Sequence, residues 1–141
     1  MSAQQERVAA ALARIPYAKF LGLHAELKGD ELTLVLPFNP ELVGNPLLPA
    51  LHGGVVGALM EMTALTQLAI SSKSEVFPKT IDIGIDYLRS GRPIDTYARA
   101  RVAKIGRRIA NVQAEAWQNE RSAPIASMHG HFLLPQEAGE S

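Results

Sequence analysis

Apolar residues recur along this chain with two different periods, and the change between them predicts its elements. Up to about residue 71 the longest apolar segments have helical spacing, and after Pro78 apolar and polar residues alternate. The predicted helical segments are 3–13, a short turn over 16–21 that Gly22 ends, and a long apolar helix over 53–71.

Before the long helix the chain predicts one hairpin and one loop. Two segments, 23–28 and 31–37, flank the turn dipeptide Gly29-Asp30 and predict a β-hairpin, with Leu32, Leu34 and Leu36 on one face. The segment 39–50 contains three prolines and a glycine and predicts a loop.

Four alternating segments follow the long helix and predict antiparallel strands over 80–87, 94–104, 108–118 and 124–134. In the first of them the predicted buried face holds Ile81, Ile83, Ile85 and Tyr87, and the opposite face, toward solvent or an interface, holds Thr80, Asp82, Gly84 and Asp86. The inward positions of the other strands are mostly small, and a sheet lined by alanine and glycine can curve closely around a helix. The predicted fold class is α+β, an antiparallel sheet wrapped around one central helix.

Composition limits the classes of protein to consider. The 141 residues fit a single domain, 1–141, and its 14 basic and 14 acidic residues leave no net charge to attract nucleic acid or anionic lipid. Cysteine is absent, which excludes disulfides and thiolate catalysis. The first 20 residues predict an amphipathic helix rather than a signal peptide, and Glu61 lies within the apolar segment 47–70, which argues against a membrane span. We therefore expect a cytoplasmic protein.

Candidate chemistry concentrates in LHGGVVGALME, residues 51–61. Gly53 and Gly54 stand where the loop becomes helix, and the free N–H groups of a first helical turn can bind an anion or polarise a carbonyl. The alternative is a helix start that needs glycine for a tight entry. Glu61 lies on a helix face whose N-terminal side is small, where a ligand or a second backbone can approach. It is a general base, a structural partner of a basic residue, or a carboxylate at a solvated helix edge.

The helical rise separates these two candidates. Gly53 and Glu61 are eight residues apart, or about 12 Å along one helix at about 1.5 Å per residue. One helix cannot easily place both on a single carbonyl, whereas two antiparallel helices from two subunits can. A working site therefore predicts at least a homodimer with two symmetric sites.

Three motifs carry a family resemblance: HGG with an acidic residue eight positions after its first glycine, TIDIGIDYLR, and RVAKIGRR. Together they resemble the hotdog-fold acyl-CoA thioesterases of the phenylacetate and 4-hydroxybenzoyl-CoA type over about residues 40–134. The resemblance implies that Gly53 polarises the thioester carbonyl and that Glu61 of the other subunit is the nucleophile or general base. It also implies that His52 shapes the pocket and that the Thr80 hydroxyl helps to hold the water.

The chain departs from that family at two positions. Relatives commonly carry Asn or Gln six residues before the histidine, where this chain has Pro46, so that Asn45 is the nearest candidate for a contact with the thioester. Some relatives also have a hydroxyl four residues after the acid, where this chain has Leu65.

Basic residues and histidines supply the remaining candidates. Arg107 and Arg108 lie in a basic turn suited to the phosphates of coenzyme A, although a solvated strand face is the alternative. His129 and His131 share a strand face, but no acidic residue lies near them in sequence, so a surface pair is favoured over a metal site. Aromatic residues make up 6% of the chain, which argues against RNA binding.

The predicted function is hydrolysis of an acyl- or aroyl-CoA thioester to the free acid and coenzyme A. No metal or other cofactor is expected, coenzyme A being part of the substrate, and the resemblance allows a homodimer or a homotetramer. Two rivals stay open: a hotdog hydratase or dehydratase, and a non-catalytic protein that binds acyl-CoA or lipid.

Overall fold

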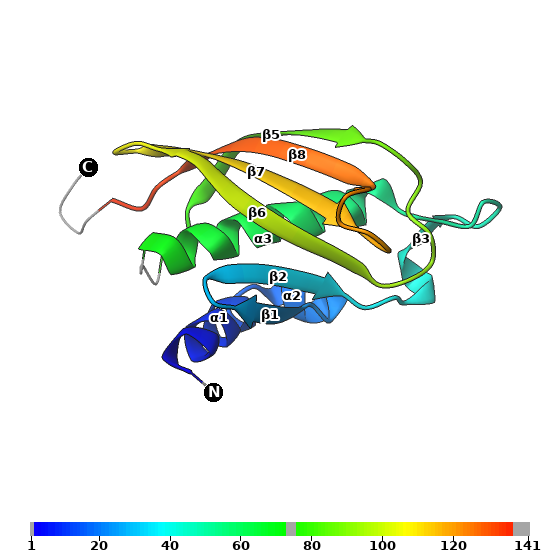
Figure 1. Ribbon diagram of the computed structural model, residues 1–141, viewed down its shortest axis with the longest axis horizontal. Coiled ribbons are helices and arrows are strands. Elements are labelled where there is room, and N and C mark those ends of the chain that lie inside the picture. The colour runs from blue at the N-terminus through cyan, green and yellow to red at the C-terminus, as the bar shows by residue number, and fades with distance from the viewer. Residues whose placement is uncertain (1, 73–75, 137–141) are drawn as a thin grey trace.

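The computed structural model describes residues 2–72 and 76–136, in which a long helix lies against the inner face of a curved antiparallel sheet (Figure 1). The helices are α1 (Ala3–Ala13), α2 (Pro16–Leu21) and α3 (Gly53–Ser72), with a 3-10 turn at Pro40–Leu42. The strands are β1 (His24–Lys28), β2 (Glu31–Leu36), β3 (Val43–Asn45), β4 (Ala50–Leu51), β5 (Lys79–Tyr87), β6 (Thr96–Ile105), β7 (Ile109–Trp117) and β8 (Ala126–Leu133). This arrangement confirms the predicted α+β class and the hotdog fold.

The two N-terminal helices have local signals at their ends. Ser2 caps α1 because its hydroxyl accepts the N–H of Gln5 at 3.1 Å, while the Gln5 side chain accepts the N–H of Ser2 at 2.8 Å. Pro16 occupies the first turn of α2, where its missing N–H costs nothing, and Gly22 ends that helix with a left-handed φ of 73°. Both helices therefore have the bounds that the sequence predicts.

The sheet order is β1-β2-β6-β7-β8-β5, with every neighbouring pair antiparallel. Strand β5 follows α3 in the chain and lies at one edge of the sheet, where its single partner among the described residues is β8. The other edge is β1, next to α1 and α2 (Figure 1).

The core lies between α3 and the concave face of the sheet. Leu59, Met60 and Leu68 of α3 have no exposed surface. The inner faces of the middle strands present small residues to the helix, namely Ala98, Ala110, Ala114, Ala116 and Ala126. Helix α3 is long and apolar enough to cross a membrane, but most of it is buried within the protein, which supports its interpretation as a core helix.

The predicted loop 39–50 is more ordered than expected. After the 3-10 turn, β3 and β4 pair as a short antiparallel hairpin, in which Val43 lies opposite Leu51 and Asn45 opposite Ala50. Its tip carries Leu47 and Leu48, whose side chains are 93% and 64% exposed. The prediction of a loop was therefore wrong for Val43–Asn45 and for Ala50, because three prolines exclude a central strand but permit a two-stranded hairpin.

A β-bulge in β5 overturns the predicted faces of that strand. Thr80 lies opposite Phe132 and Asp82 opposite His131, so Ile81 is an extra residue without a partner. One extra residue reverses the alternation before it. As a result Thr80 faces the helix, against the prediction that it shares a face with Asp82, and Ile81 is 51% exposed instead of buried.

Gly130 of β8 marks a tight contact between the sheet strands. A methyl group on Gly130 would lie 2.8 Å from Cγ2 of Ile83 and 3.0 Å from the carbonyl oxygen of Asp82. We expect Gly130→Ala to lower the free energy of unfolding by about 1–3 kcal/mol, since the bulged strand must move to admit the methyl group. Urea unfolding measures this, with Ser127→Ala in the same strand as the control. Equal midpoints for Gly130→Ala and wild type would contradict the prediction.

Candidate active site

The first turn of α3 has one unused backbone donor. Nδ1 of His52 accepts the N–H of Gly54 at 2.9 Å, and the carbonyl oxygen of His52 accepts the N–H groups of Val55 and Val56 at 3.1 and 3.4 Å. The N–H of Gly53 has no hydrogen-bond partner among residues 2–72 and 76–136. Because His52 already occupies the N–H of Gly54, Gly53 is the donor that an incoming oxygen can reach.

His52, which precedes Gly53 in the HGG motif, thus also caps the N-terminus of α3. When Nδ1 accepts a hydrogen bond, the neutral ring carries its proton on Nε2. The side chain is exposed, so Nε2 can donate to a bound group beside the turn. A methyl group on Gly44 of β3 would lie 2.8 Å from Cα of His52, which shows how closely the β3–β4 hairpin supports this residue.

Strand β5 covers the small face of α3 that was predicted to be open to a ligand. A methyl group on Gly57 would lie 2.7 Å from Cδ1 of Ile85, and one on Gly53 would lie 3.2 Å from the ring of Tyr87. The groups that approach this face are side chains of β5 in the same chain. The glycines of α3 therefore serve the close packing of β5 as well as the first turn of the helix.

Glu61 and Thr80 meet at the other end of this contact. The Thr80 hydroxyl donates to Oε2 of Glu61 at 2.7 Å, and both residues are half-buried. Glu61 forms no ion pair within the described residues, so the alternative of a structural pair with a basic residue finds no support there. The hydroxyl missing at Leu65 is thus matched by one from β5, which leaves Oε1 of Glu61 open to a further group.

Strand β5 packs along α3 from Gly53 to Glu61. Tyr87 lies beside Gly53 and Thr80 beside Glu61, because β5 runs antiparallel to α3. Gly53 and Glu61 remain about 12 Å apart along the helix axis. Each subunit therefore holds two separate groups: the N–H of Gly53, which has no partner within the described residues, and the Glu61 carboxylate, which forms no ion pair there.

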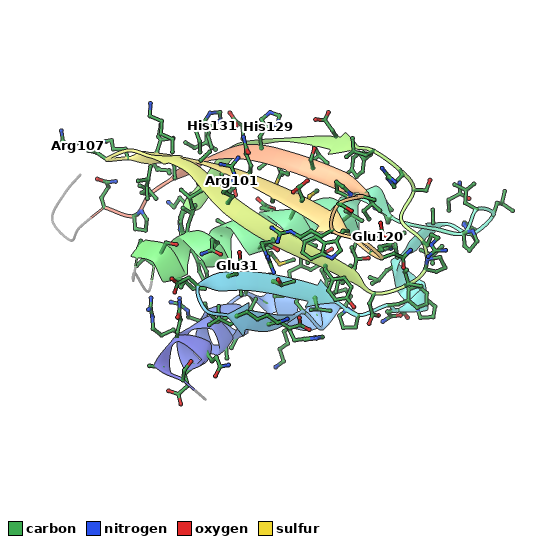
Figure 2. The ribbon with its side chains drawn as sticks, viewed as in Figure 1. Glu31, Arg101, Arg107, Glu120, His129 and His131 are labelled. Atoms are coloured by element: carbon green, nitrogen blue, oxygen red, sulfur yellow. The ribbon has the colours of Figure 1, made fainter. Side chains whose placement is uncertain are left out.

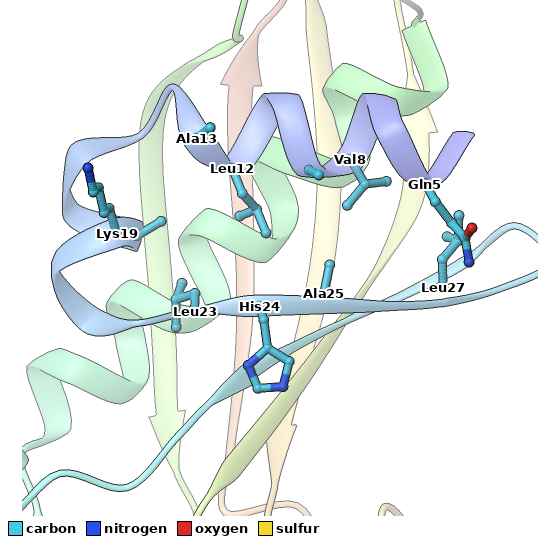
Figure 3. A pocket seen from close by; sticks show the side chains of 11 residues that line it. Gln5, Val8, Leu12, Ala13, Lys19, Leu23, His24, Ala25 and Leu27 are labelled. Carbon is cyan, nitrogen blue, oxygen red and sulfur yellow. The ribbon is translucent and has the colours of Figure 1, made fainter. Parts of the chain in front are cut away.

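A cavity of about 350 Å³ opens beside the Gly53 turn. Its wall includes Leu51, Val56, Tyr87, Ile125 and Ala126, together with Gly53 itself. A larger cavity of about 560 Å³ lies between α1 and β1, where Val8, Leu12, Leu23 and Leu27 contribute to its wall (Figure 3). The larger cavity includes none of the predicted site residues, whereas the smaller one includes Gly53 and is therefore the candidate substrate site.

Asn45, Arg107 and Arg108 lie outside this cluster within one subunit. Oδ1 of Asn45 accepts the N–H of Leu47 at 3.0 Å and so closes the turn of its own hairpin. Arg107 lies at the tip of the β6–β7 hairpin, at the end of the sheet away from the start of α3 (Figure 2), and Arg108 follows it, exposed. The predicted contacts of all three with the substrate stay predictions.

His129 and His131 lie on the outer face of the sheet, on the side away from α3 (Figure 2). Nδ1 of His131 lies 2.7 Å from Oδ1 of Asp82, and this hydrogen bond holds the pKa of the Asp82 carboxyl below its ordinary value. In the described part of the chain no three His, Asp or Glu side chains gather as metal ligands would. The expectation that no cofactor is needed stays a prediction.

Tyr87 is the residue near the site that the sequence did not single out. Its hydroxyl donates to the carbonyl oxygen of Gly53 at 2.8 Å. Periodicity placed it on the apolar face of β5, and nothing in the local pattern reports a contact with a residue 34 positions earlier.

The segment that carries these residues matches a known protein family. A model of the thioesterase superfamily matches residues 48–125, a range that includes Gly53, Glu61, Thr80 and Tyr87. The chain belongs to this superfamily. It is therefore an enzyme of the thioester hydrolase class, and the resemblance noted from its motifs is confirmed.

Relatives of known name agree with this membership. A protein of Salmonella typhimurium named medium/long-chain acyl-CoA thioesterase YigI is 30% identical over 135 residues, covering 85% of this chain and 86% of that protein. A solved protein from Chromobacterium violaceum is 37% identical with a TM-score of 0.74, covering 92% of this chain and 90% of that one. A protein from Bacillus halodurans, solved with CoA, has the same fold at 20% identity and a TM-score of 0.69, with 97% of both chains covered.

Proposed function

We propose that this protein is an acyl-CoA thioesterase, which adds water to an acyl-CoA thioester and releases the carboxylic acid and the thiol of coenzyme A. The observation that carries the proposal is the half-buried Glu61, which has no ion-pair partner in the described residues and has the Thr80 hydroxyl on one oxygen. The names of the relatives favour medium or long acyl chains over aroyl groups.

The edge of β5 supports a dimer that completes the site. This edge presents unpaired backbone groups beside the exposed apolar side chains of Ile81, Tyr87 and Leu88, which are 51–56% exposed. If two copies pair antiparallel around a two-fold axis near Ile83, the Tyr87 end of one strand meets the Thr80 end of the other. Because Gly53 lies at the first end and Glu61 at the second, the same pairing brings the N–H of one subunit to the carboxylate of its partner.

In this composite site each group has one task. The Gly53 N–H donates to the thioester oxygen and stabilises the negative charge that develops on it. Glu61 of the partner subunit either removes a proton from the attacking water or attacks the carbonyl itself. Thr80 binds Oε2 of Glu61, so Oε1 is the oxygen that takes the proton or attacks the carbonyl. The cavity beside Gly53 takes the apolar acyl chain.

The dimer also gives the distant arginines a role. The β6–β7 hairpin lies at the end of the sheet away from the start of α3 (Figure 1). In the proposed antiparallel dimer, the partner brings this end of its own sheet toward Gly53. Arg107 and Arg108 of the subunit that supplies Glu61 can then meet the phosphates of coenzyme A. A homodimer is the smallest assembly that satisfies the site, and a homotetramer of such dimers and a cytoplasmic location remain part of the proposal.

The direct test is release of the coenzyme A thiol from a panel of saturated acyl-CoA thioesters of increasing length and from benzoyl-CoA. We expect turnover that is fastest for medium or long chains. Tight binding of these thioesters without thiol release would overturn the proposal in favour of a binding protein, and hydration of an enoyl-CoA instead would favour a hydratase.

Thr80→Val tests the hydroxyl on Glu61 while keeping the shape of the side chain. We expect kcat to fall about tenfold, because the carboxylate loses the hydrogen bond that sets its orientation and each 1.4 kcal/mol is tenfold in rate. Steady-state kinetics measure this, with Thr66→Val as the control, since that hydroxyl binds the carbonyl of Met62 within α3. Unchanged kcat for Thr80→Val would remove Thr80 from the site.

A further inference from the structure

Tyr87 joins the edge strand to the turn that carries the free N–H. It is the last residue of β5, and its hydroxyl donates to the carbonyl oxygen of Gly53 at 2.8 Å although the side chain is 56% exposed. Its ring lies where a Cβ of Gly53 would be crowded, at 3.2 Å, and its hydroxyl lies 3.5 Å from the corresponding position of Gly57. The two glycines thus form the surface on which the ring rests.

The hydrogen bond of Tyr87 acts on a peptide group that needs support. The peptide between Gly53 and Gly54 is held at both ends, its carbonyl by Tyr87 and its N–H by Nδ1 of His52 at 2.9 Å. Glycine has no Cβ to restrict its φ and ψ, so in a first turn that begins with two glycines these contacts add a restraint on the backbone. Of the two, Tyr87 is the one that comes from a different element of the fold.

We propose that Tyr87 is a positioning residue for the oxyanion donor: by holding the carbonyl of Gly53 it fixes the Gly53–Gly54 peptide, and with it the Cα to which the donor nitrogen of Gly53 is bonded. This inference rests on the proposed thioesterase function. A donor accelerates the reaction only if it already points at the place where the charge develops. Since β5 is also the proposed dimer edge, Tyr87 links the formation of the dimer to the geometry of the donor.

A packing role alone makes a different prediction. The ring of phenylalanine fills the same space on Gly53 and Gly57, so Tyr87→Phe would be silent if only the ring mattered. If the hydroxyl positions the donor, Tyr87→Phe lowers kcat and kcat/KM together and leaves KM nearly unchanged. A misplacement of a catalytic group by ~1 Å can cost a hundredfold in rate. We expect a smaller loss of kcat, about tenfold, because Tyr87→Phe removes one hydrogen bond and keeps the ring in place.

The experiment compares steady-state kinetics of wild type, Tyr87→Phe and the control Tyr97→Phe, whose ring stacks on Trp117 of β7. Thermal unfolding and gel filtration establish that each variant is folded and has the wild-type assembly. A kcat of Tyr87→Phe within twofold of wild type would overturn the inference, and so would a loss that Tyr97→Phe shares. If Glu61→Gln is inactive in the same assay, the thioesterase proposal survives that outcome.

A second measurement asks whether Tyr87 acts through Gly53. The Gly53→Pro variant lacks the N–H, so there is no donor left to position. The Tyr87→Phe effect should then disappear in the Gly53→Pro background, giving a strongly non-additive double-mutant cycle. Equal fold losses in both backgrounds would mean that Tyr87 acts by another route, and would overturn the inference.

Discussion

Replacing Glu61 by glutamine is expected to lower kcat for acyl-CoA hydrolysis by about 10²–10⁴-fold, the range typical of a general base. Glutamine keeps the size of the side chain and can still accept the Thr80 hydrogen bond on its amide oxygen, so the fold should persist. What is lost is the negative charge that takes the proton or attacks the carbonyl. KM for the acyl-CoA should change much less than kcat, because Glu61 acts at the reacting carbon and does not hold the nucleotide.

The control for this variant is Glu115→Gln. Glu115 lies exposed on β7 with its side chain on the outer face of the sheet, so its substitution tests the effect of removing one carboxylate at a distance from the site. Wild-type rates for Glu61→Gln would contradict the catalytic role of this residue. Because Glu61→Gln leaves the side chains around position 61 unchanged, this variant can also be used to measure substrate binding without turnover.

Replacing Gly53 by proline should lower kcat by about 10²–10³-fold, as loss of one oxyanion-hole donor does elsewhere. Gly53 is the first residue of α3, a position where proline is well tolerated, and the substitution deletes the one N–H of the first helical turn that has no partner within the described residues. The new ring atoms press on Tyr87, whose exposed side chain can move. The control is Gly53→Ala, which makes a similar contact with Tyr87 and keeps the N–H.

Mixed dimers of these two variants test the shared site directly. In a dimer of one Gly53→Pro chain and one Glu61→Gln chain, both substitutions fall in the same composite site and the other site is intact. Random exchange of subunits should therefore restore about a quarter of the wild-type activity, since half of the dimers carry one working site of two. No recovery after verified subunit exchange would show that each site is built within one chain.

The motif residues of the candidate site lie in local patterns, which is why the sequence alone could find them. His52, Gly53 and Glu61 fall within ten residues of one helix, and the rise of a helix needs no tertiary information. The same holds for the short helix α2, whose start and end Pro16 and Gly22 mark in the sequence. The strand periods likewise predicted the four strands that follow α3.

The contacts that complete the site are long-range, and no local pattern reports them. Thr80 reaches Glu61 across 19 residues, and it does so because a bulge at Ile81 turns its side chain inward. A bulge inserts one residue without changing the alternation visible in the sequence, so periodicity assigned Thr80 to the wrong face. The hairpin of β3 and β4 was not predicted, because prolines disfavour strands on average. Whether two such short segments pair is decided by the fold around them.

By itself the sequence determined the fold class, the helix that carries the candidate chemistry and the distance that keeps Gly53 apart from Glu61 in one chain, because each depends on spacing along the backbone. Only the tertiary structure decided that β5 lies at the edge of the sheet beside α3. That placement gives Thr80 to Glu61 and Tyr87 to Gly53, and it leaves an open strand edge between them. Strand order and register depend on how side chains far apart in the chain pack together, which spacing along the backbone does not encode.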